Sequence, residues 1–382
     1  MEKKLCIFTG FILPHLGGVE RYTDKLVDQL EKMGYFITIV TTNFDNDKNY
    51  YIKQEKHEIY KLPVYSLFKS RYPLLKKNNI YRKIIKELKS KKFNGYICQT
   101  RFYLTSQLGA KISFHNRKEP IIIEHGSSHF TVNNKVLDYF GEKYEHYLTH
   151  KLKKYHPHFY GVSNRCNEWL KHFKIQADGV FYNSVDSNVY NKYKNTYYDT
   201  NSRNNIIISY VGRIIKEKGI LMLLEAFSEL NKKYNNIILY IAGDGPLLKE
   251  CQEKYSDSKI KFLGKIEYED VMKLCSQTDI FVHPSMYPEG LPTSILEAGI
   301  MKTAIIATDR GGTVEVINDK KYGLIMEENK ESLLEKLELL LNDNEKIEKL
   351  KNNIHNRITK EFTWEVTAKK LVKEMEKLNE KN

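Results

Sequence analysis

Residues 4–42 read KLCIFTGFILPHLGGVERYTDKLVDQLEKMGYFITIVTT. Lys4–Thr9 is almost continuously apolar, which is typical of a strand in a parallel sheet that is covered on both faces. After a loop with glycine and proline, residues 19–33 place apolar side chains at helical spacing, and Gly34 ends this helix before a second apolar strand at residues 36–42. Strand, helix and strand in this order predict a βαβ unit.

The same alternation of apolar strands and amphipathic helices continues along the chain in two series. In the first series, further strands are expected at residues 95–99, 120–124 and 159–162. A polar stretch rich in Asn, Tyr and Lys at residues 187–205 has little periodicity and interrupts the pattern. A second series then begins with the apolar strand at residues 206–211.

We therefore predict an α/β fold in which two doubly wound, Rossmann-like domains face a central cleft, with ligands at the carboxyl ends of the strands. The length of 382 residues suits two domains of ordinary size. The predicted parts are an N-terminal domain at 1–185, a linker at 186–205, a C-terminal domain at 206–360, and a C-terminal helix at 361–382 that packs back on the N-terminal domain.

The composition is that of a globular protein, with 41% hydrophobic and 29% charged residues. No apolar run reaches the ~18 residues that cross a bilayer, and the apolar stretch near the N-terminus is too short for a signal peptide. The five cysteines are scattered and form no CxxC pair, so we expect reduced core residues of a cytoplasmic protein.

The net charge of +13 is unevenly distributed. Residues 1–185 hold 31 Lys and Arg against 17 Asp and Glu, which gives +14, and the rest of the chain holds 30 against 31, which gives −1. Residues 69–92 carry ten basic residues and one acid, interleaved with aromatic and aliphatic side chains. Such a stretch can lie on an anionic membrane surface, at the inner face of the cell membrane, although a solvated helix face explains the charge equally well. No recognised nucleic-acid motif accompanies it, so no nucleic-acid partner is expected.

The first loop places Gly17 and Gly18 at the expected N-terminus of a helix. Glycine lets a ligand approach the backbone closely, and the free N–H groups and the dipole of a helix N-terminus favour an anion such as a diphosphate. The loop is neither a P-loop nor a GxGxxG fingerprint, and a tight turn without a ligand would account for it equally well.

Arg213 and Lys218 follow the strand at residues 206–211. At the carboxyl end of that strand, two cations can face a diphosphate and stabilise it as a leaving group.

The most specific stretch, HPSMYPEGLPTSILEA, covers residues 283–298. Its carboxylates Glu289 and Glu297 lie eight positions apart, and Pro292 suits the start of a helix that carries Glu297 on its second turn. The amides of Thr293 and Ser294 then face phosphate oxygens, and Glu297 can accept hydrogen bonds from a ribose diol.

Taken together and in this order, the motifs resemble those of the family-4 retaining glycosyltransferases, which have the GT-B fold and belong to glycosyltransferase group 1. The Glu-x7-Glu signature of the family matches Glu289 and Glu297, and its Gly-Gly loop matches Gly17 and Gly18. Further matching segments are Gly212-Arg213 with Lys218-Gly219, Glu124-His125-Gly126, Asn183–Asp186, Ala242–Pro246 and Asp309–Gly312.

The chain departs from the family pattern at a few positions. Ser184 and Pro292 stand where the family has or often has glycine, and Met301-Lys302-Thr303 stands where it often has Gly and Pro. Pro292 has no backbone N–H, so one amide fewer is available to phosphate at this helix start.

The resemblance implies roles for the candidate residues. The donor is expected in the C-terminal domain and the acceptor in the N-terminal domain, with Glu297 on the ribose, Arg213 and Lys218 on the diphosphate, and Glu289 on the donor-sugar hydroxyls. His125 is expected near the anomeric centre, and Gly17 and Gly18 are expected to close over the diphosphate. The other expected donor-binding residues are Gly243, Gly245, Gly290, Leu291, Thr293 and Ser294.

By the same resemblance, the chain is expected to be a hexosyltransferase that uses a UDP- or GDP-linked sugar and a glycan or lipid-linked acceptor, in surface polysaccharide assembly. No cofactor and no metal ion are expected, because the formal DxD at residues 45–47 lies in a polar loop of the N-terminal half. Two alternatives remain open: a non-hydrolysing nucleotide-sugar epimerase, and a catalytically silent nucleotide-sugar-binding partner of a membrane complex.

Overall fold

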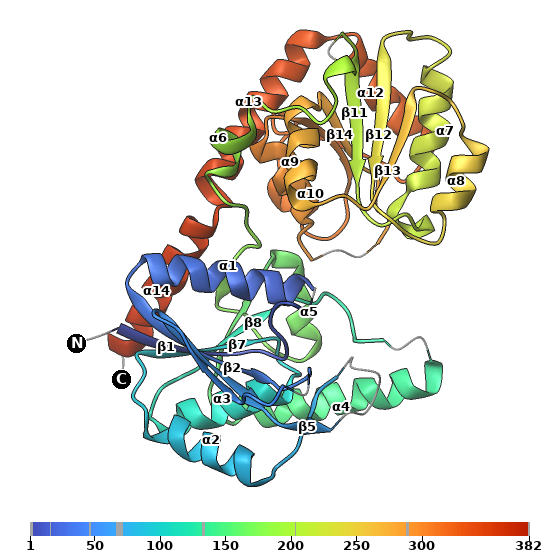
Figure 1. Cartoon of the computed structure of the whole chain (residues 1–382). Helices are drawn as coiled ribbons and strands as arrows, with labels where there is room; N and C mark the ends of the chain where they lie inside the picture. Colours follow the sequence, from blue (N-terminus) through green and yellow to red (C-terminus); the bar gives the residue numbers. More distant parts are fainter. Residues whose placement is uncertain are drawn as a thin grey trace. The chain divides into compact units, whose positions relative to one another are not determined.

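A computed structural model describes residues 3–15, 17–45, 47–65, 72–131, 134–202, 204–287 and 290–380 of the chain (Figure 1). The chain divides into two compact units. Unit 1 comprises residues 1–183 and 367–382, and unit 2 comprises residues 184–366. Each unit contains its own, mostly parallel sheet, as the alternation of strands and helices predicts.

The sheet of unit 1 has eight strands in the order β10-β9-β8-β7-β1-β2-β4-β3, in which β3 and β4 pair antiparallel and the other neighbours pair parallel. Its strands are β1 (Lys3–Phe8), β2 (Tyr35–Thr42), β3 (Tyr51–Lys53), β4 (His57–Leu62), β7 (Gly95–Gln99), β8 (Ile121–Glu124), β9 (His158–Gly161) and β10 (Gly179–Val180). A separate antiparallel pair consists of β5 (Val64–Tyr65) and β6 (Leu74–Leu75). The βαβ unit predicted over residues 4–42 is present, with Leu5 of β1 paired to Ile37 of β2.

The helices of unit 1 are α1 (Gly18–Lys32), α2 (Asn79–Ser90), α3 (Leu104–His115), α4 (Lys135–Lys153) and α5 (Asn164–His172), together with most of α14 (Trp364–Glu380). Side chains of Asn78, Asn134 and Ser163 accept hydrogen bonds from first-turn amides and so cap α2, α4 and α5. Polar residues of this kind at helix starts fix where each helix begins.

The part of α14 in unit 1 packs on the start of the sheet. Gly95 of β7 leaves room for Met375, because a Cβ at this glycine would lie 2.5 Å from the methionine sulfur. The side-chain amide of Asn379 donates to the backbone carbonyl of Asn94 at 2.8 Å. These contacts join the last residues of the chain to the N-terminal sheet.

The sheet of unit 2 has six parallel strands in the order β13-β12-β11-β14-β15-β16. The strands are β11 (Ile206–Val211), β12 (Ile237–Ala242), β13 (Ile260–Gly264), β14 (Ile280–His283), β15 (Ala304–Thr308) and β16 (Leu324–Met326). The helices after β11 are α7 (Ile220–Leu230), α8 (Leu248–Lys254), α9 (Tyr268–Gln277), α10 (Thr293–Ile300), α11 (Thr313–Val316), α12 (Lys330–Leu341) and α13 (Asn344–Glu361). The strand order is that of a doubly wound sheet.

Part of the polar segment at 186–205 is structured. Residues Val189–Tyr193 form α6, and Thr200–Ser202 form the 3-10 helix η2. Val189 and Tyr193 are buried, and the Tyr193 hydroxyl donates to Glu269 of α9 at 3.2 Å. The low periodicity of this stretch did not predict α6, because tertiary contacts and not local pattern stabilise this short helix.

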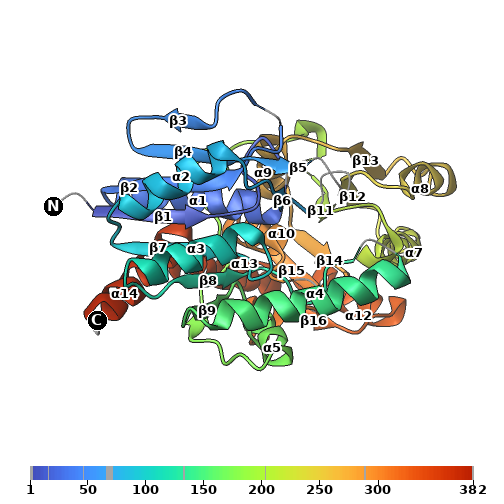
Figure 2. The same ribbon diagram turned by 90° about the horizontal axis from the view of Figure 1, so that it is seen from below.

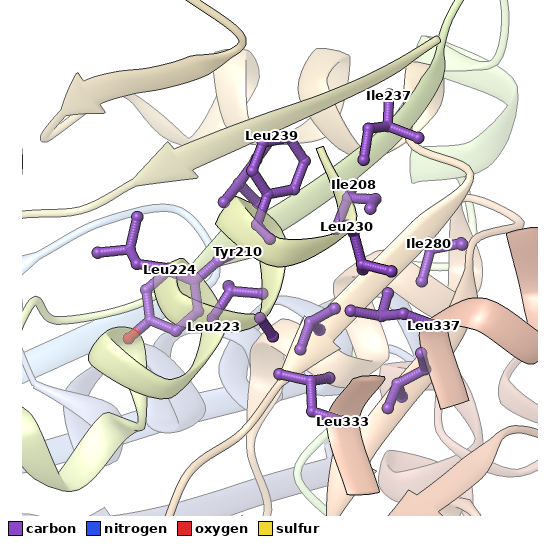
Figure 3. Close-up of a cluster of buried hydrophobic side chains, with 14 of the residues drawn as sticks. Ile208, Tyr210, Leu223, Leu224, Leu230, Ile237, Leu239, Ile280, Leu333 and Leu337 are labelled. Atoms are coloured by element: carbon purple, nitrogen blue, oxygen red, sulfur yellow. The ribbon is translucent and has the colours of Figure 1, made fainter. Parts of the chain in front are cut away.

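The core of unit 2 lies between the sheet and the helices α7 and α12. Ile208 of β11, Leu223 of α7 and Leu333 of α12 are all fully buried in it (Figure 3). Removing such a side chain from water contributes about 1.5–3 kcal/mol each. The strands β11 and β12 are apolar on both faces because helices cover both faces of the sheet.

None of the helices in the described ranges has the length and the apolar content that crossing a bilayer requires.

Candidate functional site

The strand order in unit 2 reverses at β11. This strand pairs with β12 on one side and with β14 on the other, so the chain leaves the carboxyl ends of β11 and β14 toward opposite faces of the sheet. Such a switch point is where ligands bind in open α/β sheets. The loop after β11 carries Arg213 and Lys218, and the loop after β14 leads to α10.

The two loops pack on each other through their backbones. Gly219, which ends the 3-10 helix η3 (Lys216–Lys218), has φ +71°, and a Cβ there would lie 2.0 Å from the Pro284 carbonyl oxygen. The Met286 amide donates to the Glu217 carbonyl at 2.8 Å. Only glycine fits at residue 219, and the contact fixes the loop that carries Lys218 against the end of β14.

Gly243 and Gly245 support the same loop from the other side. Gly243 has φ +143°, and a Cβ there would lie 1.8 Å from the Gly212 carbonyl oxygen. A Cβ at Gly245 would lie 2.4 Å from the Ile214 carbonyl oxygen. Both glycines are therefore explained by packing around Arg213, and their contact with a donor stays a prediction.

Arg213 and Lys218 lie around one aromatic ring. The Arg213 guanidinium carbon is 6.0 Å and the Lys218 ammonium nitrogen 5.5 Å from the centroid of Tyr287, which is 41% exposed. The Tyr210 hydroxyl donates to the Arg213 carbonyl at 2.8 Å and fixes the backbone between β11 and η3. The structure thus brings the two predicted cations together, and it adds Tyr287, which the sequence did not single out.

Helix α10 begins directly after Pro292, as predicted. Pro292 is the N-cap and provides no side-chain hydrogen bond, and the first amides of a helix have no partner within the helix. Leu291 is buried, Ser294 is half-buried and Thr293 is exposed. The start of α10 is therefore suited to an anion.

Glu297 lies on the second turn of α10 and is half-buried. It follows Thr293 by four residues, so the two side chains share one face of the helix. Burial and, second, the charge of Glu297 raise the pKa of Tyr268 and of Cys275, which places this carboxylate beside α9. Gly290, before the helix, accepts a hydrogen bond from the Gly312 amide at 2.7 Å, which ties it to the loop after β15.

Glu289, the first carboxylate of the signature, lies outside the described residues. Its predicted role stays a prediction.

In unit 1, Gly17 is the N-cap of α1 and Gly18 is its first residue. A Cβ at Gly17 would meet the end of the Glu20 side chain, whereas a Cβ at Gly18 would meet no described atom within 4 Å. Glu20 is buried and lies 3.4 Å from Nδ1 of His15. Packing among the described residues therefore does not require glycine at residue 18.

His125 directly follows β8. Its Nε2 lies 2.7 Å from Oε1 of Gln99, and its ring meets the edge of Tyr22 at a centroid distance of 4.8 Å. Burial lowers the pKa of His125 to about 4, so the ring is neutral at neutral pH. Its amide donates to Glu124 at 3.1 Å, which anchors the backbone at this position.

The sequence did not indicate a cluster of buried charged side chains next to the loop of His125. Arg101 is almost completely buried and pairs with Glu124 and Glu145, each at 2.7 Å. The guanidinium carbon lies 3.8 Å from the centroid of Phe173. No short motif links these residues, because they come from separate segments of the chain.

Two family models match consecutive parts of the chain. Residues 16–189 match the model described as Glycosyltransferase Family 4, and residues 199–357 match the model described as Glycosyl transferases group 1.

Similar proteins cover almost the whole chain. An uncharacterized glycosyltransferase of Methanocaldococcus jannaschii is 27% identical over 99% of this chain and 98% of its own length. One subunit of the human phosphatidylinositol N-acetylglucosaminyltransferase is 24% identical over 97% of this chain and 75% of its own length. The crystal structure of the Anabaena protein HepE in complex with UDP has a TM-score of 0.75 and 15% identity, covering 99% of this chain and 100% of that one. The fold is the GT-B fold.

Proposed function

The chain belongs to the group 1 glycosyltransferases, and from this premise we propose that it transfers a hexose from a UDP- or GDP-linked donor to a glycan or lipid-linked acceptor with retention of configuration. The proposal depends most on one observation in unit 2. Arg213 and Lys218 lie around Tyr287, which belongs to the loop that leads from β14 to the start of α10 at the switch point of the sheet.

In the proposed reaction, Arg213 and Lys218 stabilise the diphosphate as it leaves. The bond between the anomeric carbon and the diphosphate oxygen breaks, the acceptor oxygen bonds to the anomeric carbon on the same face, and the acceptor proton passes to the leaving diphosphate. Negative charge grows on the diphosphate in this step, so fixed cations and helix amides lower the barrier. These groups carry the positive charge that a metal ion supplies in other transferases, and we propose that donor binding is metal-independent.

We assign Glu297 to the ribose hydroxyls and Glu289 to hydroxyls of the donor sugar. Thr293 and Glu297 share one face of α10, so phosphate at the helix start and ribose one turn later would lie along the same face. The matched positions in the family carry the same assignment. Gly290, Leu291 and Ser294 flank this face, and Gly243 and Gly245 hold the loop of Arg213.

For His125 we propose a contact with the transferred sugar. Its Nε2 is engaged by Gln99, so Nδ1 is the ring nitrogen that a sugar hydroxyl would meet. The depressed pKa of His125 makes it a neutral hydrogen-bond partner and not a cation. Its role is therefore to position the sugar. We propose that Gly17 and Gly18 let the diphosphate approach the start of α1.

We further propose that the protein works at the inner face of the cell membrane, in surface polysaccharide or lipid-linked glycan assembly. Helices α2, α3 and α4 lie side by side in unit 1 (Figure 2) and line a groove of about 440 Å³. On α2, Arg82, Lys83 and Lys86 are exposed. Lys69 and Arg71 of the basic stretch lie outside the described residues.

Helix α4 also carries exposed apolar side chains. Its exposed large residues are Val136, Leu137, Tyr139, Phe140, Tyr144 and Tyr147. Val136 and Phe140 are 65% and 64% exposed, and they lie four residues apart on one face. Exposed basic residues on α2 and exposed apolar residues on α4 are the two kinds of side chain that suit the headgroup region of an anionic bilayer.

A donor screen tests the proposed activity. Purified protein is incubated with a panel of radiolabelled UDP- and GDP-sugars and a membrane extract. Label that enters the lipid or glycan fraction supports transfer. Interconversion of the nucleotide sugar without acceptor would instead support the epimerase, and binding without turnover would support a silent partner.

Sedimentation with vesicles tests the membrane surface. The protein should bind phosphatidylserine vesicles at low salt, bind phosphatidylcholine vesicles poorly, and lose binding at high salt. Replacing Arg82, Lys83 and Lys86 by Gln should weaken binding. A matched control replaces Lys232, Lys249 and Lys254 by Gln, three exposed lysines of unit 2. Vesicle binding that does not depend on salt, or that both triple substitutions weaken equally, would contradict the proposed membrane-binding surface.

A further inference from the structure

Three histidines of unit 1 converge at one place. His129 lies in the loop after β8, His146 on α4, and His172 at the end of α5. Nε2 of His172 is 3.3 Å from Nε2 of His129 and 3.1 Å from Nε2 of His146. One ligand atom from each of the three rings lies within 4.8 Å of the others.

Hydrogen bonds among the rings account for only part of this arrangement. A ring nitrogen of a neutral imidazole carries either one hydrogen or one lone pair. Nε2 of His172 can therefore make one well-directed hydrogen bond, to His129 or to His146, and the other short contact is at most a weaker, shared one. A cation between the three nitrogens would use all three lone pairs at once.

A buried carboxylate orients the first of these rings. Oε2 of Glu145 lies 3.2 Å from Nδ1 of His129 and accepts from Arg101 at 2.7 Å, and Oε1 accepts from the Phe130 amide at 2.9 Å. Because a carboxylate only accepts, the hydrogen of His129 lies on Nδ1, and Nε2 directs its lone pair to the other histidines. This carboxylate–histidine arrangement is the one that accompanies metal-binding histidines.

Aromatic neighbours fix the other rings. Trp169, one turn before His172 on α5, stacks on it with a centroid distance of 4.9 Å and an interplanar angle of 6°. The ring centroids of Phe173 and His146 lie 4.7 Å apart. The three imidazoles are thus held in place by packing, which lowers the entropy cost of binding an ion between them.

We propose that His129, His146 and His172 bind a divalent transition-metal ion of the zinc class. Zinc–nitrogen bonds of about 2.0–2.1 Å in a tetrahedron place ligand nitrogens about 3.4 Å apart. The two spacings that His172 makes, 3.3 and 3.1 Å, are close to this value. The nitrogens of His129 and His146 lie within 4.8 Å of each other, and binding of the ion would draw them together. His146 and His172 are exposed, so the fourth position faces solvent and takes water. Imidazole ligands suit zinc, copper, iron and nickel, whereas magnesium and calcium prefer oxygen.

The ion would join three segments that are far apart in the sequence. His129 belongs to the loop that starts with His125, and Glu145 connects to Glu124, at the root of that loop, through Arg101. Metal binding would therefore stiffen the segment that presents His125. The site lies in unit 1, whereas Arg213, Lys218 and Glu297 lie in unit 2. The proposed site departs from the sequence-based expectation that no metal ion is bound, whereas metal-independent binding of the donor in unit 2 does not depend on it.

Calorimetry on untagged, chelator-treated protein tests the site. Zinc chloride should bind at one ion per chain, and cobalt chloride should give the visible absorption of tetrahedral cobalt and quench Trp169 fluorescence. Saturation should raise the Tm by about 5 °C or more. His146→Gln and His172→Gln should each weaken metal binding by at least about 100-fold, more than the loss of an outer hydrogen-bond partner costs.

The matched control is His150→Gln, an exposed histidine one turn further along α4, which should leave metal binding unchanged. UDP binding to unit 2 should be unchanged in all three variants, which separates this site from the donor site. Failure to bind one ion per chain, or equal affinity in the control and in the two cluster variants, would overturn the proposal. Both cluster histidines are exposed, so their replacement should preserve the circular dichroism spectrum.

Discussion

The Arg101 guanidinium and the Glu124 carboxylate form a buried ion pair in unit 1. Nη1 lies 2.7 Å from Oε2, and the two side chains are 1% and 0% exposed. The second carboxylate, Glu145, meets Nη2 at the same distance. One cation thus pairs with two buried carboxylates at the base of the loop that carries His125 and His129.

Replacing Arg101 by Met should strongly destabilise the protein. Methionine keeps much of the side-chain volume but leaves two buried carboxylates without their cation, a loss that costs about 3–5 kcal/mol. The measurement is urea unfolding, followed by circular dichroism. Arg82→Met, at an exposed position of α2, is the control and should change the free energy of unfolding by less than about 0.5 kcal/mol. A loss for Arg101→Met no larger than that of the control would contradict the pair's structural role.

Much of the fold could be predicted because it depends on local patterns. The apolar runs at Lys4–Thr9 and 206–211 indicate buried parallel strands, and both lie in the sheets. Pro292 marks the start of α10 because proline fits a helix start and no position further inside. The switch point follows from the strand order, and it brings Arg213 and Lys218 to the place that the sequence indicates.

The remaining features depend on contacts between distant segments. Arg101 and Glu145 are 44 residues apart, and no periodicity predicts that they pair. The three clustered histidines come from a loop and two helices, without the short spacing of a metal-binding motif. The one feature of the sequence that points toward this cluster is that ten of the twelve histidines fall in residues 1–185. The sequence did not indicate Tyr287, because its contacts with Arg213 and Lys218 are visible only in the folded structure.

His125 should make stability depend on pH. Its pKa is lowered by burial to about 4, below the unfolded value of 6.5, so the unfolded state binds more protons between these values. The free energy of unfolding therefore falls as the pH drops from 6.5 toward 4. Between pH 7.5 and 5, wild type should lose about 1–2 kcal/mol more than His125→Gln, a range that allows for the half-buried position of the residue. Parallel stability curves for the two proteins would contradict this origin.

Lys218→Ala should reduce turnover by about 100-fold, as expected for loss of one group that stabilises charge in the transition state. Lys216→Ala is the matched control, because Lys216 lies in the same 3-10 helix and is exposed. Initial rates with the donor found in the screen provide the measurement. If both substitutions reduce turnover equally, the loss comes from the lower positive charge of this loop and not from a specific contact of Lys218.

Glu297→Ala should weaken binding of the nucleoside diphosphate by about 10- to 100-fold, the range for hydrogen bonds to a charged group. Calorimetric titration with UDP and GDP measures it directly. Glu250→Ala removes an exposed carboxylate from α8 and should leave the affinity unchanged. An unchanged Kd for Glu297→Ala would remove this residue from the ribose assignment.

Gly18→Ala should separate stability from activity. A Cβ at this first residue of α1 would meet no described atom within 4 Å, and alanine favours a helix over glycine by up to about 1 kcal/mol. The variant should therefore be as stable as wild type or more stable, yet turn over more slowly, because the added methyl group occupies the space that we assign to the diphosphate. Gly141→Ala, in the middle of α4 and equally open, is the control that should gain stability without losing turnover. Full activity in Gly18→Ala would mean that this glycine serves only the turn before the helix.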